Sequence, residues 1–181
     1  HSSIKSTATL QMLHVDLWGP YKVKIQSGCT QFVTIVDDFS RFTWVHLIKY
    51  KADVPTVLEN FIVYVEKQFK GTILCVRTDN AAELCDSRLK QFFHGKGVLH
   101  QTSCAYIPQQ NEVVERKHRH LQETARSLLF QSRIPDQYWG KCILCASYLI
   151  NRMPLSSLHH ATPYNMLHNE NLDYDLFKPF G

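Results

Sequence analysis

ILCVRTDN, at residues 73–80, begins with a short apolar run and carries an acidic residue, Asp79, just after it. It follows a segment, Val54–Phe69, whose apolar residues recur at the spacing of a helix. An earlier run, LHVDLWGP at 13–20, has the same strand-like character and carries Asp16. A strand, a crossover helix and a second strand are the unit from which parallel strand pairs are built. The segment therefore predicts an α/β fold.

The flanking segments extend this pattern in both directions. Three β-type runs come first, and the short connections between them favour an antiparallel meander. After the run at 73–76 we expect a helix, a fifth strand, two longer helices and a short helix. The expected order is a five-stranded mixed sheet, three antiparallel strands then parallel strands, flanked by helices. The expected early strands are Leu10–Leu17, Gln31–Asp37 and Thr43–Ile48, and the later elements are Ser87–His94, Val98–Thr102, 111–131, 136–151 and Pro163–His168.

Three acidic residues could converge on one site. Asp16 and Asp79 close β-type runs, and Glu115 lies at the start of a predicted helix. Carboxylates at the ends of neighbouring strands can lie a few ångströms apart, and a helix that crosses there can add a third. Mg²⁺ prefers a few carboxylates together with substrate phosphates and water. Two such ions about 4 Å apart support phosphodiester chemistry, so the triad suggests phosphoryl transfer on nucleic acid.

The spacing of these acids extends to longer motifs. Between Asp79 and Glu115 lie 35 residues. At these residues the chain resembles the D,D(35)E catalytic core of retroviral and retrotransposon integrases. Its sequence motifs are most similar to those of the copia class of LTR retrotransposons. Five ordered blocks carry the resemblance and span almost the whole chain: VDLWGP, VDDFSRFTWV, RTDNAAEL, IPQQNEVVERKHRHLQETAR and YLINRMP.

The resemblance implies a fold, an activity and a context. The fold would be ribonuclease H-like, with an integrase catalytic core at 10–154, a linker fragment at 1–9 and an extension of the core at 155–181. Asp16, Asp79 and Glu115 would be the catalytic residues and would hold two Mg²⁺ or Mn²⁺ ions. The enzyme would trim the 3′ ends of element DNA with water and join those hydroxyls to target DNA. It would act as a homo-oligomer on double-stranded DNA, in the nucleus as part of an integration complex and in the cytoplasm, as a piece of a polyprotein.

The helix that carries Glu115 has two faces. Val114, Leu121, Ala125 and Leu128 form the expected inward stripe, and His118 falls on the polar face beside it. Cations on the polar face can contact DNA phosphates, which supply affinity with little sequence choice. A solvated surface face is the alternative interpretation. The predicted DNA contacts are Asn111, Arg116, Lys117, Arg119, Gln122 and Arg126.

Composition limits the remaining functions only loosely. Twenty Lys and Arg against 16 Asp and Glu make the chain mildly basic, so net charge alone does not establish a nucleic-acid partner. Six cysteines without framework spacing favour reduced thiols, and Cys142 and Cys145 are expected to pack in the core. No stretch reaches the length of a membrane span. No phosphate-cradling glycine loop points to a small-molecule cofactor.

Several residues leave alternatives open. Asp37 and Asp38 could be additional metal ligands or turn residues, and Glu83 could touch the site or begin a helix. Ala81, Ala82 and Glu112 stand where the family usually has glycine; if these positions need φ > 0, each side chain costs about 1–2 kcal/mol. Such losses favour a catalytically decayed DNA-binding or assembly relic. A ribonuclease H-like nuclease that does not join strands is a further alternative.

Overall fold

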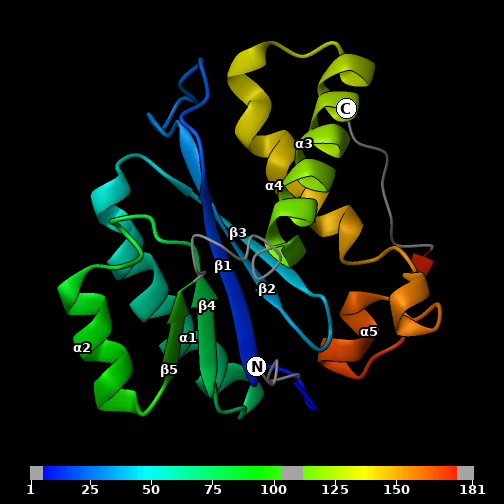
Figure 1. Ribbon diagram of the computed structural model, residues 1–181. Coiled ribbons are helices and arrows are strands. Elements are labelled where there is room, and N and C mark those ends of the chain that lie inside the picture. Colours follow the sequence, from blue (N-terminus) through cyan, green and yellow to red (C-terminus); the bar gives the residue numbers. More distant parts are fainter. Residues whose placement is uncertain (1–5, 103–111, 175–181) are drawn as a thin grey trace.

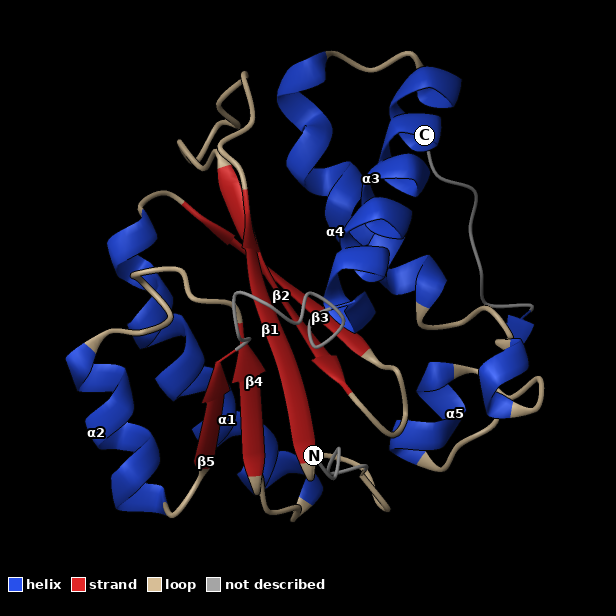
Figure 2. Ribbon diagram, viewed as in Figure 1, coloured by secondary structure: helices blue, strands red, loops and turns tan. Residues whose placement is uncertain are grey.

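The computed structural model describes residues 6–102 and 112–174. Its five strands form one mixed sheet in the order β3-β2-β1-β4-β5 (Figure 1, Figure 2). β1 lies at the centre, antiparallel to β2 and parallel to β4, and β4 is parallel to β5. The predicted mixed sheet is confirmed. The strands are β1 (Met12–Trp18), β2 (Gln31–Asp37), β3 (Thr43–Ile48), β4 (Cys75–Thr78) and β5 (Leu99–Thr102).

Helices cover both faces of this sheet (Figure 1). α1 and α2 lie on one side, and α3 and α4 pack together on the other side. The helices are α1 (Val54–Phe69), α2 (Ser87–Lys96), α3 (Glu112–Ser132), α4 (Trp139–Ile150) and α5 (Pro163–His168), with single 3-10 turns at Lys51–Asp53, Asp136–Tyr138 and Ser156–Leu158. In the described ranges, no helix is both long and apolar enough to cross a membrane.

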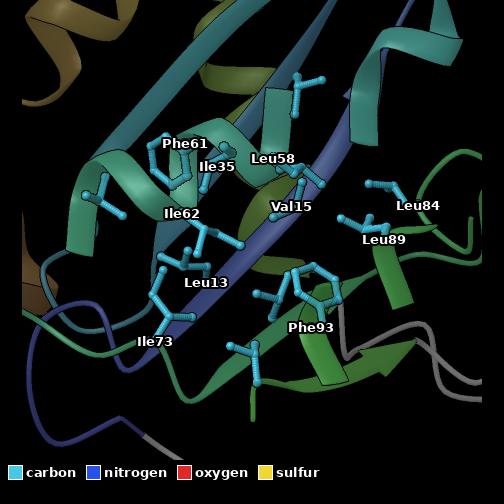
Figure 3. Packing of buried hydrophobic residues seen from close by; sticks show 14 of the residues in the cluster. Leu13, Val15, Ile35, Leu58, Phe61, Ile62, Ile73, Leu84, Leu89 and Phe93 are labelled. Atoms are coloured by element: carbon cyan, nitrogen blue, oxygen red, sulfur yellow. The ribbon is translucent and has the colours of Figure 1, made fainter. Parts of the chain in front are cut away.

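Two apolar clusters hold the layers together. Side chains alternate between the two faces of a strand, so Val33 and Ile35 of β2 face one cluster while Phe32 faces the other. The first cluster joins the sheet to α1 and α2; Figure 3 shows ten of its members labelled around β1. The second joins Phe32 to α3 and α4 and contains Cys142, which confirms the expected core packing of that cysteine.

Three predicted strands begin earlier than the observed ones, and one of them, Val98–Thr102, does so by a single residue, because β5 begins at Leu99. Leu10 has φ of 67°, outside the extended region, and its N–H donates to the Asp37 carboxylate at 2.7 Å. β1 therefore begins at Met12 rather than Leu10. The predicted run 73–76 is likewise displaced, because β4 pairs with β1 only from Cys75 to Thr78. The predicted helix at 136–151 begins with a 3-10 turn, and α4 follows from Trp139.

Candidate active site

Asp16 lies near the end of the central strand, on the sheet face that α3 covers. Residues two apart share a face of a strand, and Trp18 on the same face packs against the α3–α4 cluster. The Asp16 side chain is 13% exposed. The Leu17 N–H donates to Oδ1 of Asp16 at 2.8 Å, which ties one carboxylate oxygen to the backbone. The other oxygen, Oδ2, points toward His118 of α3 at 3.4 Å from Nδ1.

The register of the sheet brings Asp79 to the level of Asp16. Val15 of β1 pairs in parallel with Thr78 of β4, so the two aspartates come next on neighbouring strands. Adjacent strands are about 4.8 Å apart. Oδ1 of Asp79 accepts the Ala81 N–H at 3.0 Å, which holds the turn that leaves β4.

Glu115 enters the same region from the first turn of α3, where it is exposed. Burial, repulsion by Asp79 and, more weakly, repulsion by Glu115 raise the pKa of Asp16 to about 7, against the lowering effect of the Leu17 N–H. A negative charge close to a carboxylate disfavours its ionised form, as expected where carboxylates gather without a cation. The structure thus couples the three predicted acids electrostatically at the end of β1.

The donor set suits a hard divalent cation in chemistry and charge, because Mg²⁺ prefers oxygen ligands such as carboxylates and a cation would relieve their repulsion. The geometry is less complete. Within residues 6–102 and 112–174, no three His, Cys, Asp or Glu side chains stand together as ligands of one metal ion.

The predicted position of His118 on its helix was wrong. We expected it on the polar face of the Glu115 helix, but it is 7% exposed and belongs to the buried stripe with Val114, Leu121 and Ala125. Burial lowers its pKa to about 4, so the imidazole is neutral at pH 7 and its contact with Asp16 is no ion pair. Its ring stands edge-on to Phe32, with ring centroids 5.6 Å apart. In the described part of the chain its Nε2 is buried and has no hydrogen-bond partner.

Helical periodicity could have placed His118 correctly. Positions 114, 118, 121 and 125 follow the i, i+4, i+7, i+11 spacing of a single helical stripe. The polar type of the residue, rather than its position, suggested the surface.

Five of the six predicted DNA contacts divide into three groups. Arg119 and Arg126 are exposed on α3 and Gln122 is half-buried beside them. Arg116 is exposed but lies 3.7 Å from the Glu112 carboxylate one turn earlier. Asn111 lies outside the described residues.

Lys117 differs from its neighbours on α3. It is half-buried, and burial together with the positive charge of Arg41 lowers its pKa to about 8. Its ammonium is therefore less available to an incoming phosphate than the side chains of Arg119 and Arg126.

Asp37 and Asp38 serve the turn after β2. Asp37 accepts hydrogen bonds from the N–H and hydroxyl of Ser40, at 2.8 and 2.6 Å, besides the one from Leu10. Asp38 lies 3.0 Å from Nε2 of His14 and 3.4 Å from Arg41. These contacts confirm the turn interpretation and leave the two carboxylates engaged away from Asp16.

Glu83 fits neither alternative. It lies in the turn before α2 and pairs with Lys51 at 3.1 Å. The residue that caps α2 is Asp86, whose carboxylate accepts the N–H groups of Arg88 and Leu89.

The positions where glycine is replaced are unstrained. Among the described residues, seven other than glycine have positive φ, and Ala81, Ala82 and Glu112 are not among them. Glu112 begins α3 with helical backbone. The expected strain cost at these positions is therefore wrong, and the property of Glu112 that bears on DNA binding is its negative charge.

Comparison with solved structures establishes the fold. The chain superimposes on a chain of the simian T-cell lymphotropic virus intasome, in complex with a PP2A regulatory subunit, with a TM-score of 0.72, 16% identity and coverage of 94% of this chain and 58% of that chain. The HTLV-2 integrase catalytic core domain in complex with magnesium gives a TM-score of 0.65 at 17% identity, covering 90% of this chain and 99% of that one. The predicted ribonuclease H-like fold is confirmed.

Sequence comparison establishes the family. Residues 6–108 match the model of the integrase core domain; Glu115 lies beyond the matched range. Retrovirus-related Pol polyproteins are similar over nearly the whole chain: 32% identity to that of transposon TNT 1-94 of Nicotiana tabacum over 99% of this chain, and 33% to that of transposon RE1 of Arabidopsis thaliana over 99%. The chain spans only 14% and 12% of the lengths of these polyproteins. It therefore belongs to the integrase core domain family and is homologous to the Pol polyproteins of copia-type retrotransposons.

Proposed function

We propose that this chain is the catalytic core of a divalent-metal-dependent polynucleotidyl transferase, which trims the 3′ ends of element DNA and joins them to target DNA. The observation that carries the proposal is the Asp16 carboxyl, whose pKa is raised to about 7 by burial and by the charges of Asp79 and Glu115. Groups with strongly shifted pKa values and specific charged neighbours are typical of functional sites.

Asp16, Asp79 and Glu115 would hold two Mg²⁺ or Mn²⁺ ions. Such ions, when bound, activate an attacking oxygen and stabilise a leaving oxygen in phosphodiester chemistry. The Leu17 N–H would orient one Asp16 oxygen, and the buried imidazole of His118 would pack against the other and exclude water. Ligand carboxylates that are held in this way lose less freedom on metal binding.

Polar and basic side chains of α3 would hold the DNA backbone beside these acids. Arg119, Gln122 and Arg126 lie on the face of α3 that carries Glu115, so phosphates bound there would run toward the carboxylates. Arg116, Lys117 and Asn111 complete the proposed set of contacts. The partners would be element ends and target DNA in the nucleus, bound by a homo-oligomer, with the core at 10–154 and its extension at 155–181.

A strand-transfer assay with Mn²⁺ and a labelled oligonucleotide tests the proposal. Joining by the parent chain should disappear in Asp16→Asn, Asp79→Asn and Glu115→Gln. Glu123→Gln is the matched control, because Glu123 is exposed on the same helix two turns further along. Calorimetric titration of the same variants with Mn²⁺ adds a readout that needs no DNA. Loss of joining by Glu123→Gln, or Mn²⁺ binding unchanged by Asp16→Asn, would contradict the proposed site.

A catalytically decayed DNA-binding relic is the second candidate. Two observations favour it: the described residues hold no ready group of metal ligands, and Glu112 places a carboxylate against Arg116 on the proposed DNA face. A relic would bind DNA without joining and without any effect of Mn²⁺. A nuclease of the same fold would cleave the labelled strand in Mn²⁺ but yield no joined product.

A further inference from the structure

A cavity of about 190 Å³ opens between the end of β1, α3 and α4. Three aromatic side chains, Trp18, Tyr21 and Trp139, line it, with Leu129 on the α3 side. Trp18 and Tyr21 are only half-buried, although Trp18 stacks on Phe32 at 5.0 Å between ring centroids. Two long polar side chains, Gln122 and Arg126, also line the cavity.

The cavity adjoins the acidic site. Asp16 and Trp18 share one face of β1 and are two residues apart, which is about 6.6 Å along a strand. His118 contacts Asp16 and stands edge-on to Phe32, on which Trp18 stacks. A chain of packed side chains therefore joins the proposed catalytic carboxylate to the aromatic wall.

The wall and the polar side chains suit one kind of ligand. Flat aromatic side chains bind the faces of unpaired bases without regard to sequence. Glutamine can pair with the edge of a base through its amide, and arginine adds a positive charge for the neighbouring phosphate. An apolar protein side chain would use the aromatic wall but would leave Gln122 and Arg126 unexplained.

We propose that this cavity binds one unpaired nucleobase of the DNA strand whose phosphate lies at the acidic site. The inference rests on the proposed function, since it takes its ligand from that reaction. It adds to that reaction a base-binding subsite, built by Trp18, Tyr21, Gln122 and Arg126, which would position the strand next to the point of cleavage or joining.

The test uses the whole chain, EDTA and oligonucleotide duplexes that end in a few unpaired nucleotides. Replacing each unpaired nucleotide in turn by an abasic residue should weaken binding about 5- to 100-fold at one position and little elsewhere. Tryptophan fluorescence should be quenched by the natural end and recover with the abasic residue at that position, because two of the three tryptophans line the cavity. A flat abasic scan, in which no position weakens binding more than the others, would overturn the proposal.

Filling the cavity gives a second test that preserves its aromatic wall. Leu129→Phe should remove the abasic effect while leaving binding of a fully paired duplex unchanged. Leu128→Phe is the matched control: Leu128 packs on the same cluster and is also half-buried, but it does not line the cavity. Equal effects of both variants would overturn the proposal. A flat abasic scan together with altered self-association of Leu129→Phe would also overturn it, because that result would assign the cavity to a second copy of the chain.

These outcomes separate the subsite from the activity. A position-specific abasic effect without Mn²⁺-dependent joining would support the cavity and contradict the proposed enzyme. Normal joining with a flat abasic scan would contradict the cavity alone.

Discussion

Asp16 gives the chain a pH dependence that can be measured without substrate. Its folded-state pKa is about 7, against an ordinary value of 3.8, so the folded state retains a proton that the unfolded state releases. This contribution to stability is fully present below about pH 4 and is lost as pH rises through 7. Asp16→Asn should therefore raise the free energy of unfolding at pH 8 in EDTA, by at most about 4 kcal/mol, and leave it unchanged at pH 4.

Urea unfolding at pH 4, 6 and 8 checks the difference between the parent and Asp16→Asn. Comparing two chains cancels the titration of the other groups. Glu123→Gln should show no such pH-dependent gain, and added Mg²⁺ should stabilise the parent at pH 8 but not Asp16→Asn. A difference that is constant with pH would mean that Asp16 is not proton-linked.

Glu112 acts through charge. Because its backbone is helical rather than left-handed, Glu112→Gly, Glu112→Ala and Glu112→Gln should all raise DNA affinity to a similar extent. Each releases Arg116 from an exposed pair, and exposed pairs contribute about 0.2–1 kcal/mol, so the gain should be about 2- to 5-fold and should shrink at high salt. Fluorescence anisotropy at two salt concentrations measures it. A gain confined to glycine would restore the backbone explanation.

At the scale of the elements, α3 should contribute phosphate contacts that survive the loss of catalysis. Arg119→Ala should flatten the slope of log affinity against log salt by about one unit, because it removes one contact that releases counterions. Lys117→Ala should change the slope less, because Lys117 is half-buried with its pKa lowered to about 8. Glu115→Gln should retain DNA affinity. Salt titrations of these chains would disprove the assignment if the slopes for Lys117→Ala and Arg119→Ala were reversed.

The elements differ in how much of them could be predicted from sequence. The bounds of α1 were predicted fully, since its apolar stripe is unbroken and Lys70, with φ of 51°, ends it. β1 was predicted two residues early because the left-handed conformation of Leu10 depends on Asp37, which is distant in sequence. At the site, strand ends predicted where Asp16 and Asp79 fall, and helical spacing would have placed His118 in the buried stripe. Its contacts with Asp16 and Phe32, by contrast, join residues that are distant in sequence. Such tertiary contacts leave no local signal.

At the scale of the whole molecule, the segment after Pro154 is tied to the sheet. Leu167 of α5 is buried in the same cluster as β1 and α1, and the Tyr164 N–H donates to the Asn151 carbonyl at 2.8 Å. Arg152 also stacks on Tyr148 and Tyr164, at 3.6 and 4.6 Å from the ring centroids. These contacts span α4 and α5, so the extension should unfold with the core rather than before it.

Leu167→Ala tests this coupling. Removing a buried leucine side chain costs about 2–5 kcal/mol when the surroundings do not collapse, and Leu167 is 8% exposed, so we expect a loss in the lower part of that range. The loss should shift a single unfolding transition that circular dichroism and tryptophan fluorescence report alike. Fluorescence is the decisive probe: no tryptophan lies in α5, so an extension that unfolded independently would leave the fluorescence midpoint unchanged.

Met166→Ala is the control, since Met166 is the half-buried neighbour on the same helix and its replacement should cost clearly less stability. If Leu167→Ala left the fluorescence midpoint unchanged, α5 would not be part of the cooperative core. The proposed extension at 155–181 would then be a separate unit.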